Sequence, residues 1–315
     1  MEVKQYDGTA SDGITVDEPN KVYHSTGNLS HTAIKRIAMA GIVDYFFRKE
    51  KGDTDAMKKG RISHAMLAGT FDDEFVIFEG KKPTSASVSA YHKGSKQSDT
   101  IKASVEKWLE IESRSQKESK EIVTEKDCNL MKSCVDSVLD RPMVKKFLDF
   151  KNIPELTFRA DGVQARPDLF FPDGIGRVDE IGFADGPVVI DWKSIAKIDK
   201  TVSIAKEWAE RYLLQCPWFD YVFQKLGITV PEQNYLFVFF EKEYPYQVYT
   251  FRPYYCPVSI PGEDDPVDLF RLGQAKVKEI IEDLKIQRRE TTSVDSYYSY
   301  LTEVRNYWIE GWNLN

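Results

Sequence analysis

Apolar residues recur at helical spacing in the first half of the chain and at strand spacing in the second. Before residue 150 the apolar positions follow a period of three to four residues, which is typical of amphipathic helices. A short run, Phe-Val-Ile-Phe, interrupts them and predicts a strand. The predicted helices cover about 28–49, 55–68, 100–117 and 124–149, with the strand at 75–78.

After residue 150 the chain is rich in β-branched and aromatic residues separated by Gly, Pro and Asp, a composition that favours strands. The predicted strands are 155–160, 163–171, 186–194, 235–242 and 246–253, and the predicted helices between and after them are 201–225 and 266–288. Strands that alternate with helices in this way predict an α/β fold, a mixed central β-sheet flanked by helices, with an N-terminal helical layer.

Three segments lack a regular apolar pattern. Residues 1–24 are polar and predict a flexible lead-in, and residues 81–100, rich in Ser and Lys, predict a mobile surface loop. The tail 291–315 is rich in Tyr and Trp, which predicts docking onto the body or a contact with another subunit or DNA. We therefore expect a single domain over 25–290, with its sheet core at about 155–290.

Composition sets limits without naming a function. The chain has 315 residues, 42% of them hydrophobic and 30% charged, as in ordinary globular proteins. Its net charge of −7 argues mildly against a protein that simply coats nucleic acid, although an acidic total is compatible with a local basic groove. An acidic N-terminus and the lack of a long apolar run predict a soluble, cytoplasmic protein without a membrane segment. The four cysteines, without metal-binding spacing, are expected to be reduced: Cys128, Cys134, Cys216 and Cys256.

The stretch Val-Val-Ile-Asp-Trp-Lys-Ser at 188–194 places charges at the end of an apolar strand. Side chains alternate along a strand, so Asp191 and Lys193 share one face while Trp192 points to the other. Asp168 follows Pro167 on the preceding predicted strand, and the two aspartates converge if these strands are neighbours. Two adjacent carboxylates call for a cation, and hard oxygen ligands favour Mg²⁺ or Mn²⁺. Such a site suits phosphodiester hydrolysis, with Lys193 orienting the attacking water.

This pattern resembles the PD-(D/E)XK nuclease superfamily, whose signature is Pro-Asp on one strand and Asp or Glu, any residue, then Lys on the next. The stretch Gly60-Arg-Ile-Ser-His64-Ala-Met-Leu67 is similar to the histidine helix of the RecB-like branch, and Gln215 matches the start of its Q-x-x-x-Y element. Residues 25–51 also resemble the opening of the RecE, or exodeoxyribonuclease VIII, family.

The resemblance implies a Mg²⁺-dependent exonuclease, with Mn²⁺ as a substitute, that digests double-stranded DNA ends from 5′ to 3′ in phage-type recombination. It also implies a ring-shaped homo-oligomer and a single-strand annealing recombinase as partner. The implied metal ligands are His64, Asp168, Asp191 and the Trp192 carbonyl, with Lys193 and Gln215 in the catalytic set. The sequence departs from Q-x-x-x-Y at Phe219, with Tyr221 two residues later, which removes a hydroxyl expected to handle strand ends.

Several alternatives stay open at this point. Asp191 and Lys193 could form a silent surface ion pair, and Glu155 could be either a further metal ligand or an exposed strand-end charge. The same core also fits a structure-specific or restriction-type endonuclease, or a non-catalytic module that binds DNA ends. Lysine and arginine clusters beside the motifs are either a solvated surface or a phosphate-tracking groove: Lys58, Lys59 and Arg61, then Lys193, Lys197, Lys200 and Lys206.

Overall fold

A mixed five-stranded sheet forms the centre of the fold. The computed structural model describes residues 1–47, 54–178, 181–197, 209, 211–255, 257–258 and 267–290. In the sheet order β13-β12-β11-β8-β5, β11 is parallel to β12 and antiparallel to β8, which confirms the predicted α/β class with a mixed sheet. The strands are β5 (Ile153–Pro154), β8 (Leu169–Phe171), β11 (Val188–Ile195), β12 (Tyr235–Glu241) and β13 (Val248–Phe251).

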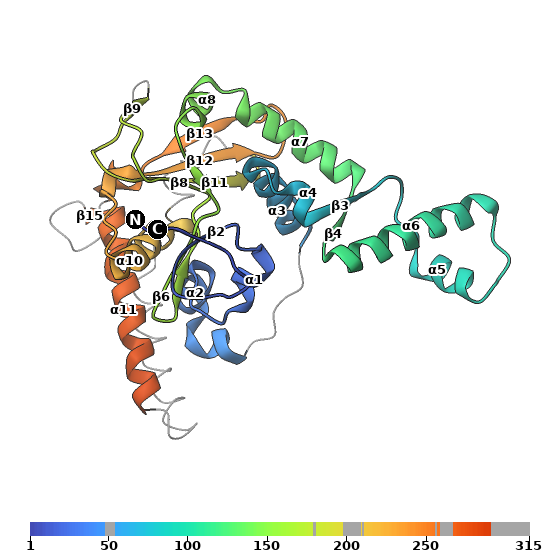
Figure 1. The fold of residues 1–315 in the computed structure, drawn as a ribbon, viewed down its shortest axis with the longest axis horizontal. Helices are drawn as coiled ribbons and strands as arrows, with labels where there is room; N and C mark the ends of the chain where they lie inside the picture. Colours follow the sequence, from blue (N-terminus) through green and yellow to red (C-terminus); the bar gives the residue numbers. More distant parts are fainter. Residues whose placement is uncertain are drawn as a thin grey trace.

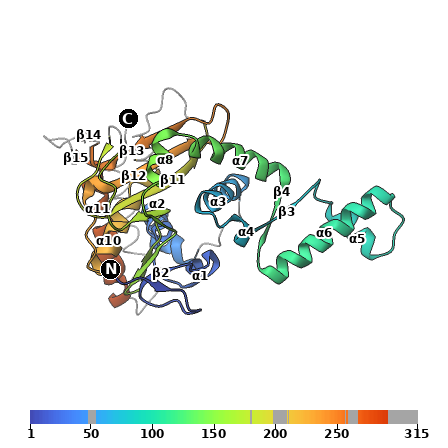
Figure 2. The same ribbon diagram turned by 45° about the horizontal axis from the view of Figure 1, so that its top comes forward.

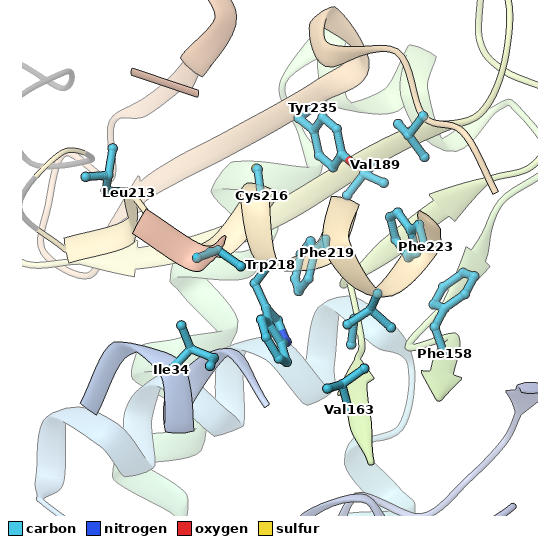
Figure 3. Packing of buried hydrophobic residues seen from close by; sticks show 14 of the residues in the cluster. Ile34, Phe158, Val163, Val189, Leu213, Cys216, Trp218, Phe219, Phe223 and Tyr235 are labelled. Atoms are coloured by element: carbon cyan, nitrogen blue, oxygen red, sulfur yellow. The ribbon is translucent and has the colours of Figure 1, made fainter. Parts of the chain in front are cut away.

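Helices cover both faces of this sheet, and the alternation along β11 assigns each residue to a face. Val189 and Ile195 belong to a core cluster shared with helices α2 (His31–Phe47), α10 (Gln215–Lys225) and α11 (Leu269–Glu290). Figure 3 shows this cluster, in which Phe219 and Phe223 of α10 lie near Val189. Ile190 and Trp192 face the opposite cluster with α7 (Glu125–Leu139) and α8 (Pro142–Leu148). Odd-numbered positions of β11 therefore face α2 and α10.

The contact between α10 and α11 is unusually close at Gly273. A Cβ atom at this position would lie 2.5 Å from the Leu213 carbonyl oxygen and 2.6 Å from Cγ of Pro217. Only glycine leaves room for the two backbones to approach this far. The packing fixes the start of α10, where Gln215 lies.

The N-terminal segment differs from the flexible lead-in expected for residues 1–24. It forms β1 (Lys4–Gln5), β2 (Gly13–Val16) and most of α1 (Asn20–Ser25). β2 pairs with β6 (Thr157–Ala160), which pairs with β7 (Val163–Ala165), so the segment completes a second sheet of order β1-β2-β6-β7. Residues far apart in the sequence thus order the start of the chain.

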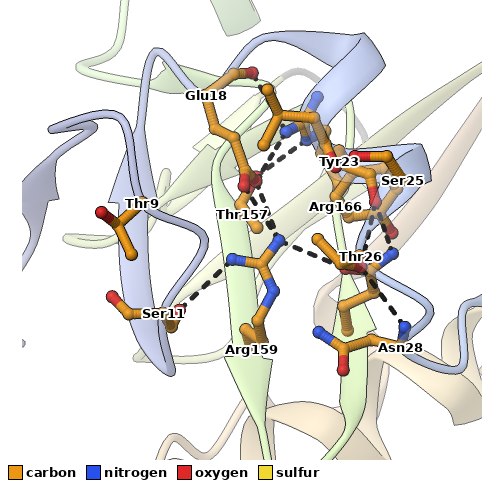
Figure 4. Close-up of polar contacts among 12 residues, drawn as sticks. Thr9, Ser11, Glu18, Tyr23, Ser25, Thr26, Asn28, Thr157, Arg159 and Arg166 are labelled. Atoms are coloured by element: carbon orange, nitrogen blue, oxygen red, sulfur yellow. Dashed lines mark hydrogen bonds and ion pairs between the residues drawn. The ribbon is translucent and has the colours of Figure 1, made fainter.

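A buried ion network explains this order (Figure 4). The Glu18 side chain is fully buried and accepts hydrogen bonds from Arg159 Nη2, at 2.9 and 3.1 Å, and from Arg166 Nη2 at 3.0 Å. The guanidinium of Arg166 also lies 4.2 Å from the centre of the Tyr23 ring. A carboxylate between two guanidiniums satisfies charges that burial would otherwise penalise strongly.

Residues 75–124 form an arm that extends from the body (Figures 1 and 2). Its strands β3 (Phe75–Phe78) and β4 (Glu121–Thr124) pair in parallel, and they enclose α5 (Ser85–His92) and α6 (Asp99–Glu118). The expected loop at 81–100 therefore contains a helix, α5, and the start of α6. We refer to residues 75–124 as the arm. It follows α3 (Asp55–Ala68) and α4 (Phe71–Glu74) and leads into α7.

The remaining elements are short, and the predicted aromatic tail at 291–315 lies outside the described residues. No helix in the described ranges combines the length and apolar character needed to cross a bilayer. The short elements are β9 (Arg177–Val178), β10 (Ile181–Gly182), β14 (Pro257–Val258), β15 (Val267–Asp268) and the 3-10 helices η1 (Glu232–Asn234) and η2 (Pro253–Tyr255).

We expect Glu18→Gln to destabilise the protein by about 3 kcal/mol, because it leaves two buried guanidiniums without a carboxylate. The free energy of unfolding in urea measures this effect. Glu2→Gln removes an exposed carboxylate from the same segment and serves as the control, with a change within about 0.5 kcal/mol. Equal stabilities of the two variants would contradict the role of the network.

Candidate active site

Asp168 and Asp191 meet where β8 and β11 lie side by side. In this antiparallel pair Leu169 faces Ile190, so the next position along each strand brings the two aspartates together. Asp168 Oδ2 also accepts a hydrogen bond of 2.6 Å from the backbone N–H of Trp192. Both carboxylates are buried, with exposed fractions of 9% for Asp168 and 2% for Asp191. The predicted convergence of Pro167-Asp168 with Asp191 is thus present in the geometry.

Lys193 and Gln215 hold the Asp191 carboxylate from two sides. Lys193 Nζ contacts Asp191 Oδ1, and Gln215 Nε2 donates a hydrogen bond of 2.8 Å to Asp191 Oδ2. Gln215 reaches the aspartate because α10 covers the face of β11 that carries its odd-numbered residues. Its own Oε1 atom is buried and has no hydrogen-bond partner among the described residues. An unsatisfied acceptor beside a buried carboxylate can interact with an additional positive ligand.

His64 reaches the same centre from α3. Its Nδ1 atom lies 3.1 Å from Asp168 Oδ1. One turn earlier on α3, Gly60 lies against β11, where an added Cβ would come within 3.4 Å of Ser194 Oγ. The close approach of helix and strand brings the imidazole to the aspartate, which explains why a glycine precedes the histidine by four positions.

Burial and mutual repulsion shift the pKa values of the two aspartates apart. Burial, followed by the charge of Asp168, raises the pKa of Asp191 to about 7. Burial alone would also raise the pKa of Asp168, but the charge and hydrogen bond of His64 hold it below its ordinary value. The pKa of Lys193 is raised because its two aspartate neighbours outweigh the opposing effect of burial. Negative charge at this centre is only partly compensated.

Glu155 adds a third carboxylate beside Asp168. It has a left-handed backbone (φ 48°), and its N–H donates to the Asp168 carbonyl at 3.1 Å. Burial, followed by the charge of Asp168, raises the pKa of Glu155 to about 8. Glu155 is therefore a half-buried carboxylate that interacts electrostatically with Asp168, and its role as a metal ligand stays a prediction.

The donor set suits a hard divalent cation, although its carboxylates are bonded to protein groups in this conformation. Within the described residues, no three His, Cys, Asp or Glu side chains are already arranged as a metal cage. Burial, followed by carboxylate crowding, raises the pKa values of Glu155 and Asp191, and a bound cation would relieve this cost and could also interact with the unpaired oxygen of Gln215. The residues present thus fit Mg²⁺ or Mn²⁺.

Three residues near Lys193 were missed by the sequence motifs. Lys193 Nζ lies 5.3 Å from the centre of the Tyr212 ring, and Lys35 Nζ lies 5.4 Å from the same ring. Phe219, by contrast, packs into the core near Phe223, so it does not supply an aromatic group to the site. Tyr212 is three residues before Gln215, a helical spacing that could have suggested a shared face.

His31 is the third missed residue, and it lies at the start of α2. Burial, followed by the charges of Lys193 and Lys35, lowers its pKa to about 3. Its Nε2 atom is buried and lacks a hydrogen-bond partner within the described part of the chain. A neutral imidazole therefore lies within electrostatic reach of two ammonium groups and adds no charge to them.

The lysine and arginine residues of the predicted basic clusters differ in their surroundings. Lys58 and Arg61 form ion pairs with Glu121 at 3.3 and 2.8 Å, which favours a structural role for both. Lys59 lies near Lys242, whose pKa is lowered by burial and then by the charge of Lys59. Lys197 is exposed beyond the end of β11, and Lys200 and Lys206 lie outside the described residues.

Comparison with known proteins gives a structural likeness but no family. No protein-family model matches the chain, and no curated protein matches it. The crystal structure of a "Putative exonuclease" from Eubacterium rectale is similar, with a TM-score of 0.46 and 11% sequence identity. The match covers 84% of this chain and 86% of that chain.

The low pKa of His31 predicts a stability loss in acid. An imidazole that stays neutral when folded binds a proton only on unfolding, so stability is full above pH 6.5 and falls as the pH decreases toward 3. Between pH 7 and pH 5 we expect His31 to account for up to about 2 kcal/mol of this loss. His31→Gln should remove that part in urea unfolding at the two pH values. His92→Gln, at an exposed histidine, should leave the loss unchanged, and identical behaviour of the two variants would refute the assignment.

Proposed function

We propose that this protein is a metal-dependent deoxyribonuclease of the PD-(D/E)XK type that cleaves phosphodiester bonds of DNA. The observation that carries the proposal is the meeting of Asp168 and Asp191 across β8 and β11, with Lys193 on one aspartate and His64 on the other. Paired acids beside a lysine match the needs of phosphodiester hydrolysis, and a silent surface ion pair would not be buried in this way.

A bound Mg²⁺, for which Mn²⁺ could substitute, would polarise the phosphate and lower the pKa of a coordinated water. Asp168, Asp191, His64 and the Trp192 carbonyl are the proposed ligands, with Glu155 as a further carboxylate. The remaining chemistry comes from the chain. Lys193 carries a full positive charge, so it can orient the attacking water and stabilise charge that develops on the phosphate.

Gln215 is proposed to position Asp191. Its amide fixes one carboxylate oxygen, so the other is directed toward Lys193. Tyr212 and Lys35 border Lys193 from the side of α2 and α10, where a phosphate of the substrate can contact a second ammonium. His31 remains neutral there, so it can donate one hydrogen bond without repelling the lysines.

Within this class, we favour a RecE-like exonuclease that degrades double-stranded DNA from 5′ ends. The sequence order of the histidine helix, the Pro-Asp strand, the Asp-x-Lys strand and Gln215 supports this choice. A ring-shaped oligomer and an annealing recombinase as partner belong to the same proposal.

Replacement of Lys193 or Asp191 should abolish cleavage and spare binding. We expect Lys193→Met and Asp191→Asn to lose at least about 100-fold in nucleotide release from 5′-phosphorylated linear duplex with Mg²⁺. Lys132→Met, at an exposed lysine on α7, is the control and should release nucleotides at the wild-type rate. Circular dichroism and duplex binding in EDTA verify that the variants fold. Wild-type release rates in Lys193→Met would overturn the catalytic assignment.

An exonuclease and an endonuclease would act differently on covalently closed circular DNA. An exonuclease needs a strand end, so covalently closed circular duplex should stay intact under conditions that degrade the linearised form. Cutting of the circle would favour a structure-specific or restriction-type endonuclease. Binding of duplex ends without any product, in both Mg²⁺ and Mn²⁺, would favour the non-catalytic module.

A further inference from the structure

The arm carries its positive charge at one end. Residues 81–102 contain five lysines against a single acid, Asp99, in a chain whose net charge is −7. The loop between α5 and α6, with Lys93 and Lys96, lies farthest from the body (Figures 1 and 2). We call residues 81–102 the arm tip. Charge is thus separated along the arm, although the protein as a whole is acidic.

Basic side chains form ion pairs at the base of the arm, whereas most lysine side chains at the tip do not. Toward the body, Lys107 pairs with Glu79 at 2.8 Å, and Arg114 and Lys120 each pair with Glu118 at 2.9 Å. At the tip, Lys82 Nζ lies 4.6 Å from the centre of the Trp108 ring. The side chains of the other four lysines are exposed and form no hydrogen bond or ion pair with the described residues: Lys81, Lys93, Lys96 and Lys102. Unpaired charges of one sign attract a polyanion, whereas paired charges do not.

Hydrogen bonds order the arm tip, although it is rich in lysine. Thr84 and Ser98 cap α5 and α6 through hydrogen bonds to the backbone N–H groups of Ser87 and Ile101. Gln97 Nε2 donates to the Ser87 carbonyl at 2.7 Å and links the loop to α5. Lys102 therefore lies on a capped helix, and Lys93 and Lys96 lie in a loop that is hydrogen-bonded to α5, which lowers the entropy cost of binding an extended ligand.

The root of the arm is tied to the helix that carries His64. Lys58 Nζ of α3 donates to the Ile122 carbonyl of β4 at 2.6 Å, and Arg61 pairs with Glu121. His64 is three positions after Arg61 on the same helix. A ligand held at the tip and a phosphate held at the active site would thus be connected through one short, rigid path.

We propose that the arm tip binds the phosphate backbone of duplex DNA at a distance from the cleavage site, an inference that rests on the proposed nuclease function. α6 has 20 residues and a length of about 30 Å, which corresponds to about nine base pairs. Lys, Ser and Thr, the residue types that contact phosphates without reading sequence, dominate the tip. A protein partner would call for aromatic or apolar anchors, and Ile101 is the single exposed large hydrophobic residue recorded at the described tip.

Matched four-site variants test this proposal. In the tip variant, Lys81, Lys93, Lys96 and Lys102 become Gln. In the control, four exposed body lysines that also form no ion pair with described residues become Gln: Lys4, Lys21, Lys132 and Lys278. Both variants lose four positive charges, so a difference between them reports position and not net charge. The probes are a fluorescent duplex of about 30 base pairs and a hairpin with a stem of about six, shorter than the arm.

Anisotropy in EDTA at several salt concentrations gives the dissociation constants. We expect the tip variant to bind the long duplex at least about tenfold more weakly than the control, with a salt dependence reduced by about two to four counterions. On the short hairpin the two variants should bind alike. Equal binding of the long duplex by both variants would overturn the inference and leave an acidic protein as the occupant of the tip. If the tip variant lost affinity equally for the long duplex and the short hairpin, the contact would lie near the active site, and the inference would be overturned as well.

The test is separate from that of the proposed nuclease function. Cleavage at saturating protein should proceed at the wild-type rate in the tip variant, because the arm tip contains no residue of the acidic centre. If wild-type protein cleaves while the tip variant binds like the control, the arm inference fails and the nuclease function stands. If wild-type protein cleaves nothing, the nuclease function fails whatever the tip variant binds.

Discussion

The burial of Asp168 beside Asp191 is the constraint on which the candidate site depends. Two carboxylates in a water-poor environment repel one another, and the raised pKa of Asp191 records that cost. A fold selected for stability alone would place apolar residues at these positions. Here the neighbouring strands, the histidine helix and α10 all direct a polar group at the same pair, so the stability cost is concentrated where ligand binding can offset it.

Side chains alternate between the two faces of β11, so this one strand contributes residues to both the hydrophobic core and the candidate site. Trp192 packs among apolar side chains under α7 and α8, while Asp191 and Lys193, on either side of it, face α2 and α10. A shift of one residue in register would bury the charges in the apolar cluster and move the tryptophan to the face of the acidic centre. The parallel pairing of β11 with the fully buried β12 therefore holds the chemistry in place as well as the core.

The local sequence pattern predicted many of the helices and strands and the two aspartates of the site. It failed where a segment is ordered by residues that are distant in the sequence. Helix 55–68 and the strand at 75–78 were found at their observed limits because both depend on residues that are close together in the sequence. The order of residues 1–24 was missed because Glu18 obtains its partners about 140 positions later. Helix α5 of the arm was missed because Ser and Lys residues mask the cap at Thr84, whereas α6 was predicted to within one residue at each end. His31 showed no motif, since its importance arises only when α2 packs beside Lys193.

The surroundings of Lys193 show why the charge of this site cannot be judged from its acids alone. Lys193 has Asp191 on one side and the Tyr212 ring on the other, and Lys35 lies beyond that ring. A protonated His31 would place a third cation in this small volume, and burial together with the two ammonium groups prevents it. The site thus separates into an acidic half under Asp168 and Glu155 and a cationic half around Lys193. A phosphodiester, whose charged oxygens need cations and whose attacking water needs a base, is complementary to both halves at once.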